Sequence, residues 1–384
     1  MAGTRGPSPA QEYWANRGSG CEPALFWGRI RMADRNRIKS ERPTVAVVIP
    51  YYNGSKYIDR SAQSVLDQTV QPDEFVVVND GSRPEEAAYL RKVARKYKFR
   101  IIDKENGGQG SARNAGVAAT YASFISFLDQ DDYYLDTHIE TLLNAVPRND
   151  PHLGWVYGDL FEAEGNGDVL RTSMVTAHSV HPKSNAYDLL RNDMFVLPSA
   201  SLISRKAFEA VDGFDPQFMG YEDDDLFLRI FRRGFTNYFV PQAVTVWCMN
   251  TESTSYSIRM SRSRIRYFKK LVANFPDDAS KARFYLRDLL IPRFHGLFVS
   301  DVYNAIVCPV PERDERLKPH TDELLGILKE YVDIVLANRN VKPAYKRKIA
   351  LEYRVLATRS PLLIRLARIG LSGIRRVQAF LRRF

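Results

Sequence analysis

The sequence predicts an α/β fold in which a mostly parallel, Rossmann-like sheet is followed by a helical C-terminal extension. Short apolar runs at 45–49, 75–78 and 124–128 are typical of strands that are buried on both faces. Stretches with helical spacing separate these runs, which indicates βαβ units. From about residue 255 onward the spacing is helical. The chain of 384 residues is long enough for two to three domains.

The first half of the chain alternates between strand and helix patterns. The run Val45–Ile49 stops at Pro50, and we expect the first strand to end there. Around Ile58–Gln68 the apolar residues fall on one side of a helix. The further elements that we expect here are a strand at 75–78, a helix at 85–97, a strand at 100–102, a helix at 110–119 and a strand at 124–128.

Residues 150–250 are more mixed, and we expect strands at 155–157 and 243–247 and a helix at 224–233. Helices are expected at 323–337 and 345–357, after a proline-rich break. The predicted organisation is a disordered leader over 1–42, an α/β domain over 43–255, a helical region over 256–358 and a basic amphipathic helix over 359–384. Met32 offers an alternative start within the leader.

The positive charge of the chain is concentrated in its last segment. The net charge is +10, but residues 340–384 alone carry 12 basic residues and one acidic residue. Residues 43–250 carry 20 basic and 28 acidic residues, so the α/β region is acidic. A nucleic-acid-binding domain would spread a basic face over its folded part, so this distribution favours contact with an anionic membrane instead.

Three cysteines are too few for a disulfide framework, and their spacing does not fit a zinc site. The sequence has no apolar run of about 18 residues and no signal peptide, so we expect a cytoplasmic protein without a transmembrane helix.

Three acids, Asp129, Asp131 and Asp132, directly follow the predicted strand at 124–128. An isolated motif of this kind is usually a solvated acidic turn. Here it lies at the sheet edge where α/β folds bind ligands, and carboxylates two residues apart can turn toward one point. Mg²⁺ and Mn²⁺ take oxygen ligands and often share them with substrate phosphates. The motif therefore favours a divalent metal site.

Four consecutive acids, Glu222–Asp225, stand at the start of a predicted helix. Acids at this position interact favourably with the helix dipole, but one or two would suffice for that role. Four clustered carboxylates repel one another, so one of them could have the raised pKa of a general base.

The segment Asn106–Asn114 is a glycine-rich turn that leads into a helix. Such a turn either caps the helix or cradles a phosphate with backbone N–H groups, and Arg113 adds positive charge. The glycines do not follow the first strand, which disfavours a nicotinamide dehydrogenase, and the sequence has no GxxxxGK[ST] motif of a P-loop NTPase.

Taken together, five motifs resemble those of the family 2 glycosyltransferases in both order and spacing. They are VAVVIPYYNGSKYIDRSAQSVLDQT, FVVVNDGS, NGGQGSARNAG, FISFLDQDD and GFDPQFMGYEDDDLFLRIFRRG, within residues 44–250. The resemblance implies a GT-A fold, a nucleotide-diphosphate sugar as donor and a divalent metal, Mn²⁺ or Mg²⁺, as cofactor.

The resemblance also implies a role for individual residues. Asp223 would be the general base of an inverting transfer, Glu222 would orient the acceptor, and Asp131 would bind the metal. The residues implied in binding the nucleotide sugar are Pro50, Tyr52, Asn53, Asp80, Asn106, Gly107, Arg113 and Asp129.

Two positions depart from the family pattern. Asn250 stands where many members have a histidine, and Gln130 is larger than the small residue often found inside the metal-binding motif.

The sequence therefore predicts an inverting glycosyltransferase that acts on a glycan or lipid-linked acceptor in cell-surface polysaccharide biosynthesis. Two alternatives remain open, which are a non-catalytic protein that binds nucleotide sugars and a structural protein of the membrane surface. The ordered acidic motifs favour the enzyme.

The last segment, 359–384, has the pattern of a helix with one apolar and one arginine-rich face. An ordinary amphipathic helix packs on its own protein, but here the opposing face lacks acids altogether. We therefore expect peripheral contact with the inner face of the cell membrane. The apolar face would comprise Leu363, Leu366, Ala367, Leu371, Ile374, Val377, Phe380, Leu381 and Phe384.

Overall fold

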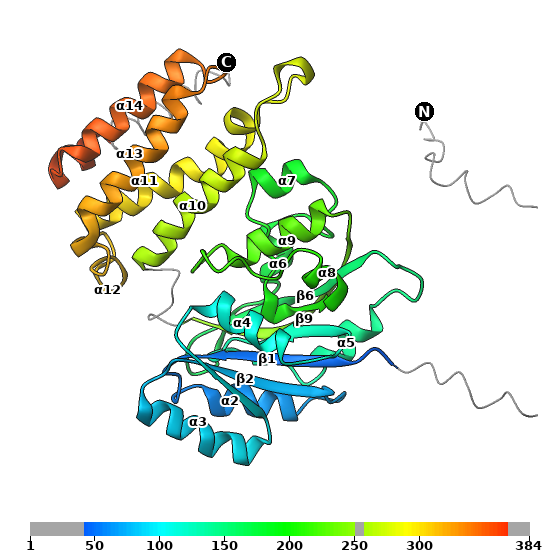
Figure 1. Ribbon diagram of the computed structural model, residues 1–384. Helices are drawn as coiled ribbons and strands as arrows, with labels where there is room; N and C mark the ends of the chain where they lie inside the picture. Colours follow the sequence, from blue (N-terminus) through cyan, green and yellow to red (C-terminus); the bar gives the residue numbers. More distant parts are fainter. Residues whose placement is uncertain (1–41, 250–256, 368–384) are drawn as a thin grey trace, which may run out of the picture. The chain divides into compact units, whose positions relative to one another are not determined.

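The structure is a computed structural model, and it describes residues 42–249 and 257–367. Three of the sequence predictions lie outside these ranges: nearly all of the leader, the position Asn250, and the basic helix beyond residue 367. Residues 43–384 group into one unit by their internal contacts. This unit is shown in Figure 1.

Four parallel strands form the first half of one sheet, in the order β3-β2-β1-β4. Residues Val45–Tyr51 of β1 are all buried, because β2 and β4 pair with the two edges of the strand and helices cover the two faces of the sheet. The bounds of the four strands are Val45–Tyr51 for β1, Glu74–Asp80 for β2, Arg100–Lys104 for β3 and Phe124–Phe127 for β4.

The second half of the sheet is mixed, in the order β8-β6-β9-β5, with β7 paired to β6. Strand β8 runs antiparallel to both β4 and β6, whereas β6 and β9 are parallel. The fold class is confirmed: the first half of the sheet is parallel throughout, and parallel pairing recurs in the second half between β6 and β9. The bounds are Tyr133–Tyr134 for β5, Leu153–Ala163 for β6, Val169–Arg171 for β7, Ser201–Ser204 for β8 and Thr236–Cys248 for β9.

Helix α4 covers one face of the parallel half, and α2 and α3 lie on the other (Figure 1). Gly116 allows α4 to come close to the sheet, because a Cβ atom there would stand 2.3 Å from Cγ1 of Val48. The helices of the α/β part are Ile58–Leu66 for α2, Pro84–Tyr97 for α3, Gln109–Ala118 for α4, His138–Asn144 for α5, Met174–His178 for α6, Ala186–Arg191 for α7, Arg205–Glu209 for α8 and Glu222–Arg232 for α9.

The helical region packs around an aromatic core. The rings of Phe268 and Tyr331 are 5.1 Å apart, and those of Phe298 and Tyr331 are 4.7 Å apart. Phe294 adjoins both phenylalanines. The helices are Ile258–Asn274 for α10, Ile291–Val307 for α11, Pro311–Asp314 for α12, Thr321–Ala337 for α13 and Pro343–Ala357 for α14, and a π-helix at Leu286–Leu290 leads into α11.

Ion pairs join the helical region to the α/β part. Lys270 on α10 contacts Asp225 at 2.6 Å and Asp215 at 2.8 Å. Arg293 on α11 pairs with Asp224, and both side chains are almost completely buried. The helical region therefore lies directly behind the four acids at the start of α9.

One sequence prediction about the strands was wrong. Strand β1 continues through Pro50 to Tyr51 instead of ending at the proline. Pro50 has no N–H group to donate, but β1 still pairs there with Val78 of β2. In the ranges that the structure describes, no helix is both long enough and apolar enough to cross a lipid bilayer.

Candidate functional site

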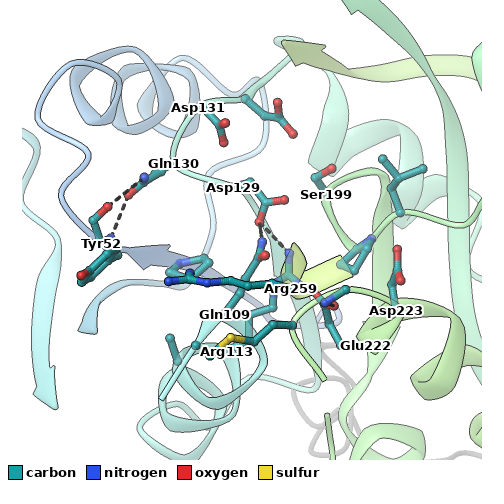
Figure 2. Close-up of a pocket in the computed structure, with 18 of the residues that line it drawn as sticks. Tyr52, Gln109, Arg113, Asp129, Gln130, Asp131, Ser199, Glu222, Asp223 and Arg259 are labelled. Carbon is teal, nitrogen blue, oxygen red and sulfur yellow. Dashed lines mark hydrogen bonds and ion pairs between the residues drawn. The ribbon is translucent and has the colours of Figure 1, made fainter. Parts of the chain in front are cut away.

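A cavity of about 830 Å³ opens at the carboxyl ends of β1, β2 and β4, next to the start of α9 (Figure 2). Parallel strands bring their carboxyl ends to one edge, which is where open α/β sheets bind ligands. Of the site residues that the sequence predicts, Gly107 is not part of the lining. The others all line the cavity: Pro50, Tyr52, Asn53, Asp80, Asn106, Arg113, Asp129, Asp131, Glu222 and Asp223.

The loop after β1 presents an aromatic ring at one end of the cavity. The side chain of Tyr52 is 46% exposed, so its ring is open for stacking. Asn53 has a left-handed backbone with φ 49°, which asparagine tolerates better than most residues. Its N–H donates to Oγ of Ser82 at 3.1 Å, and its Oδ1 accepts from the N–H of Arg83 at 3.0 Å.

Asp80 at the end of β2 holds the glycine-rich segment in place. Its Oδ1 accepts from Nζ of Lys104 at 2.6 Å and from the N–H of Gly107 at 3.0 Å. Its Oδ2 accepts from the N–H of Gly108 at 2.8 Å, and Nδ2 of Asn106 donates to its carbonyl at 2.9 Å. Gly107 thus affects the cavity indirectly, by holding the carboxylate of Asp80. Oδ2 of Asp80 can still accept a further hydrogen bond.

The buried Arg113 connects Asp129, in the loop after β4, to Glu222 at the start of α9. Arg113 is 2% exposed, and its Nη2 contacts Oδ1 of Asp129 at 2.6 Å. Its Nη1 contacts Oε1 of Glu222 at 3.4 Å. Gln109 also donates to Oδ1 of Asp129, at 2.6 Å. Asp129 is therefore engaged in an internal network, and Asp131 lines the cavity beside it (Figure 2).

The acids after β4 fit a metal that is shared with substrate phosphates. Among the described residues, no three His, Cys, Asp or Glu side chains are grouped closely enough to hold a metal by themselves. Magnesium is often held by only one or two carboxylates together with phosphate oxygens of the substrate. Asp131 can provide such a carboxylate. Burial, followed by the charges of Asp131 and Asp129, raises the pKa of Asp132 well above its usual range. This crowding of negative charge favours a cation at the site.

The four acids at the start of α9 have different partners. Glu222 pairs with Arg113, Asp224 with Arg293, and Asp225 with Arg229 at 2.7 Å. Asp223 has no cationic partner among the residues that the structure describes. Its Oδ1 accepts from the N–H of Asp224, at 2.8 Å, and the residue lines the cavity.

The environment of Asp223 makes it a stronger base than an ordinary aspartate. Burial raises its pKa well above the usual range, and the charges of Glu222, Asp224 and Asp193 raise it further. The unpaired position and the raised pKa are what a carboxylate needs in order to accept a proton near neutral pH.

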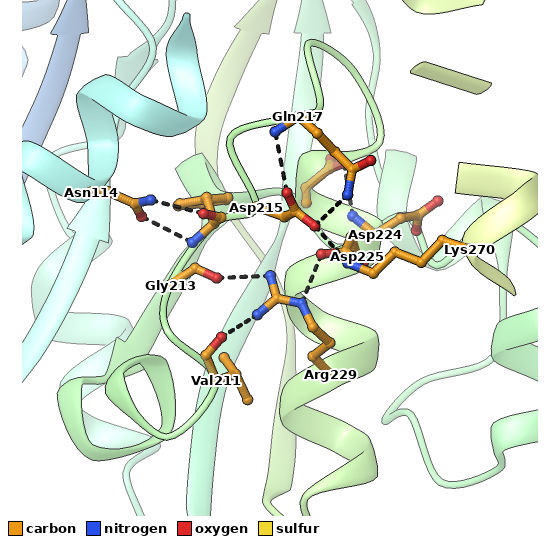
Figure 3. A network of polar contacts seen from close by, with 11 residues as sticks. Asn114, Val211, Gly213, Asp215, Gln217, Asp224, Asp225, Arg229 and Lys270 are labelled. Atoms are coloured by element: carbon orange, nitrogen blue, oxygen red, sulfur yellow. Dashed lines mark hydrogen bonds and ion pairs between the residues drawn. The ribbon is translucent and has the colours of Figure 1, made fainter. Parts of the chain in front are cut away.

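A network behind α9 fixes the loop at 211–217 (Figure 3). Nη2 of Arg229 donates to the carbonyl of Gly213 at 2.7 Å, and its guanidinium also contacts the carbonyl of Val211. Asn114 on α4 exchanges two hydrogen bonds with the backbone of Phe214, at 2.8 and 2.9 Å. The loop that leads into α9 is thus held by side chains from α9 itself and from α4.

The cavity also contains residues that the sequence did not single out. Phe195 and Tyr221 both have positive φ, at 48° and 65°, which is strained for an aromatic residue. Arg259 in the first turn of α10 lines the cavity and forms no ion pair with a described residue. No local sequence pattern distinguishes these residues, because their roles depend on which distant segments meet at the cavity.

Comparison with known proteins agrees with this arrangement. Residues 46–212 match the model of glycosyl transferase family 2, and residues 196–252 match that of the N-terminal domain of galactosyltransferase. The sheet, the acidic loop after β4 and the acids of α9 define the class as a glycosyltransferase with the GT-A fold. Within that class, residues 46–212 form a family 2 domain.

Two curated relatives match about half of this chain. An uncharacterized glycosyltransferase from Rickettsia bellii is 31% identical over 204 residues, which cover 52% of this chain and 29% of the relative. The chondroitin synthase of Pasteurella multocida is 29% identical over 189 residues, covering 49% of this chain and 19% of the synthase. The chain thus spans about a third or less of the length of such relatives.

A solved structure shares the fold over a larger part of the chain. The structure of S. aureus TarS 1–349 in complex with UDP-GlcNAc has a TM-score of 0.59 and 17% sequence identity. The match covers 85% of this chain and 92% of the TarS chain, so it extends into the helical region.

Proposed function

We propose that this protein is an inverting glycosyltransferase that moves a sugar from a nucleotide-diphosphate sugar to a hydroxyl of a glycan or lipid-linked acceptor. The observation that carries the proposal is Asp223, an acid without a cationic partner in the described chain, with a raised pKa, on the wall of the cavity. The relatives named as chondroitin and hyaluronan synthases support a role in polysaccharide synthesis.

In the proposed reaction, the acceptor hydroxyl transfers its proton to the carboxylate of Asp223. The acceptor oxygen then forms a bond to the anomeric carbon while the bond to the nucleoside diphosphate breaks on the opposite face of the sugar. Glu222 is fixed by Arg113 and by the N–H of Gly220, which donates to its Oε2 at 2.7 Å, so it can orient the acceptor. At the other end of the cavity, Tyr52 would stack on the base.

The test is turnover of a panel of nucleotide-diphosphate sugars, with water as acceptor, by the wild type and by Asp223→Asn. The substitution keeps size and removes basicity, so turnover should fall by about 10²-fold or more while donor affinity changes little. Asp212→Asn is the matched control, because Asp212 is exposed and lies outside the cavity. The product released by the wild type should have inverted anomeric configuration. Near-normal turnover by Asp223→Asn would assign the base to another residue.

We further propose that Asp131 holds a divalent cation, Mn²⁺ or Mg²⁺, together with the diphosphate of the donor. When bound, the cation would neutralise negative charge on the leaving group. Calorimetry should show tight binding of a nucleoside diphosphate only with Mn²⁺ present, and Asp131→Ala should abolish that dependence. Asp136→Ala, an exposed acid nearby, serves as control. Equal affinity with and without Mn²⁺ would contradict the role of Asp131.

Finally, we propose that the C-terminal segment contacts the inner face of the cell membrane. Residues 361–367 are helical and leave Leu362, Leu363 and Leu366 exposed to the extent of 67%, 51% and 55%, while Ile364 is buried. Three exposed leucines on one turn, next to Arg365, have the character of a membrane-contacting surface. This contact would bring the cavity near a lipid-linked acceptor.

A further inference from the structure

Gln130, the residue between the two acids of the metal-binding motif, reaches across the cavity edge to the loop after β1 (Figure 2). Its Oε1 accepts from the N–H of Tyr52 at 2.9 Å, and its Nε2 donates to the carbonyl of Tyr52 at 3.2 Å. A single side chain therefore binds both backbone groups of the residue whose ring is exposed at the nucleotide end.

The approach of Gln130 to this loop requires a glycine. A Cβ atom on Gly54 would stand 2.2 Å from Oε1 and 2.4 Å from Cδ of Gln130, which is far inside van der Waals contact. The backbone of Gly54 does not have positive φ, so alanine could adopt its conformation. Gly54 is thus needed for the space that it leaves to Gln130.

The loop is also anchored on its other side. Asn53 is held by hydrogen bonds with Ser82 and Arg83 in the loop after β2. Between these bonds and Gln130, the backbone of residues 52–53 is fixed from two directions while the ring of Tyr52 stays 46% exposed. An exposed ring on a fixed backbone is preorganised for stacking, because less conformational freedom is lost on binding.

We propose that Gln130 is a positioning residue that fixes the Tyr52 loop for a planar nucleoside base, and so couples the metal-binding loop to base recognition. This inference rests on the proposed function, because it assumes that the cavity binds a nucleoside diphosphate. It explains why a large amide stands at a position where a small residue would suffice to space two acids. The nucleoside base contributes to affinity through its contact with this loop, whereas the diphosphate is bound elsewhere in the cavity and does not depend on the loop.

The first test compares two ligands by calorimetry in the presence of Mn²⁺. Of UDP, GDP, ADP and CDP, the one that the wild type binds most tightly is taken as the nucleoside ligand, and pyrophosphate is the ligand without a base. Gln130→Ala should weaken nucleoside diphosphate binding by about five- to tenfold, in keeping with the loss of two hydrogen bonds, and leave pyrophosphate binding unchanged. Gln63→Ala, an exposed glutamine of α2, should alter neither. Equal weakening of both ligands, or no weakening, would overturn the proposal.

The second test is a double-mutant cycle of Gly54→Ala and Gln130→Ala. In the wild type, Gly54→Ala should displace Gln130 and weaken nucleoside diphosphate binding about as much as Gln130→Ala does. In the Gln130→Ala background it should have no further effect, whereas additive losses would overturn the proposal. Urea unfolding of the same four proteins checks the contact without any ligand, since Gly54→Ala should destabilise only the proteins that retain Gln130. If the wild type binds none of the nucleoside diphosphates, the proposed function fails. If Gly54→Ala destabilises the protein equally with and without Gln130, the contact between Gly54 and Gln130 is refuted, whatever the result of the binding experiment.

Discussion

Asp223 differs from Glu222 and Asp224 through residues that are distant in the sequence. Arg113 comes from α4 and Arg293 from α11, and each neutralises one of the neighbours. Asp223 is left with the repulsion of Glu222, Asp224 and Asp193, and it forms no ion pair with a described residue. Its basicity is therefore a product of the fold.

The raised pKa of Asp223 predicts the pH dependence of turnover. The base must be unprotonated, so activity should fall as the pH drops through its pKa, at a pH well above the usual carboxyl range. Asp193 is exposed and raises this pKa by its charge, so Asp193→Asn should shift the acid limb to lower pH. Asp168→Asn, an exposed acid of the β6–β7 hairpin, should leave the profile unchanged. If turnover falls at the same pH in the wild type and in Asp193→Asn, the loss of activity at low pH reports the protonation of a group other than Asp223.

At the scale of residues, the sequence located the wall of the cavity but not the roles of its members. Asp80, Asp129 and Asp131 could be predicted because they lie at or just after the carboxyl ends of strands in the parallel half, and such strand ends meet at one edge. The contact between Gln130 and Tyr52 could not be predicted. It joins loops that are 78 residues apart, and nothing in either segment indicates the other.

Among the elements, α9 is the one on which the helical region acts most directly. Arg293 of α11 reaches Asp224 in the first turn of α9, and its Nη1 also donates to the carbonyl of Leu189 at 2.9 Å. Lys270 of α10 holds Asp225 in the same turn. The first turn of α9 carries the proposed base, so the ion pairs from the helical region help to position that base.

The buried pair predicts a large loss of stability when Arg293 is replaced. Arg293→Met leaves Asp224 buried without its cation, which typically costs about 3–5 kcal/mol. Arg262→Met is the matched control, because Arg262 of α10 pairs with Glu323 at a half-exposed position and should contribute about 1 kcal/mol or less. Urea unfolding of the three proteins measures the difference. Similar losses for both variants would mean that the Arg293 pair stabilises no more than a surface pair.

The strands of the parallel half were predicted within a few residues, whereas those of the mixed half were predicted only in part. Buried parallel strands such as β1 and β2 leave continuous apolar runs, which the sequence shows plainly. Strand β9 spans Thr236–Cys248 and includes a proline and several exposed positions, so only its buried end gave a strand signal. The direction of β8 depends on the route of the chain between β6 and β8, which no local pattern encodes.

Over the molecule as a whole, charge is divided between an acidic α/β part and a basic end. Residues 43–250 carry eight more acidic than basic residues, and residues 340–384 carry eleven more basic than acidic residues. An acidic domain is repelled by an anionic membrane, while the basic end is attracted to it. This arrangement would hold the chain at the surface by its end and leave the cavity accessible.

The membrane proposal predicts co-sedimentation of the full chain with anionic vesicles, and loss of binding in a truncation that ends at Thr358. Each basic residue near an anionic surface contributes about 1 kcal/mol, so binding should weaken as salt is raised and should be absent with neutral vesicles. Replacing the exposed Leu362, Leu363 and Leu366 together by serine keeps the charge and removes apolar area. This variant should bind more weakly than the full chain and still respond to salt. If the full chain and the truncation both stay in the supernatant, or both sediment equally, the end of the chain does not attach the protein to membranes.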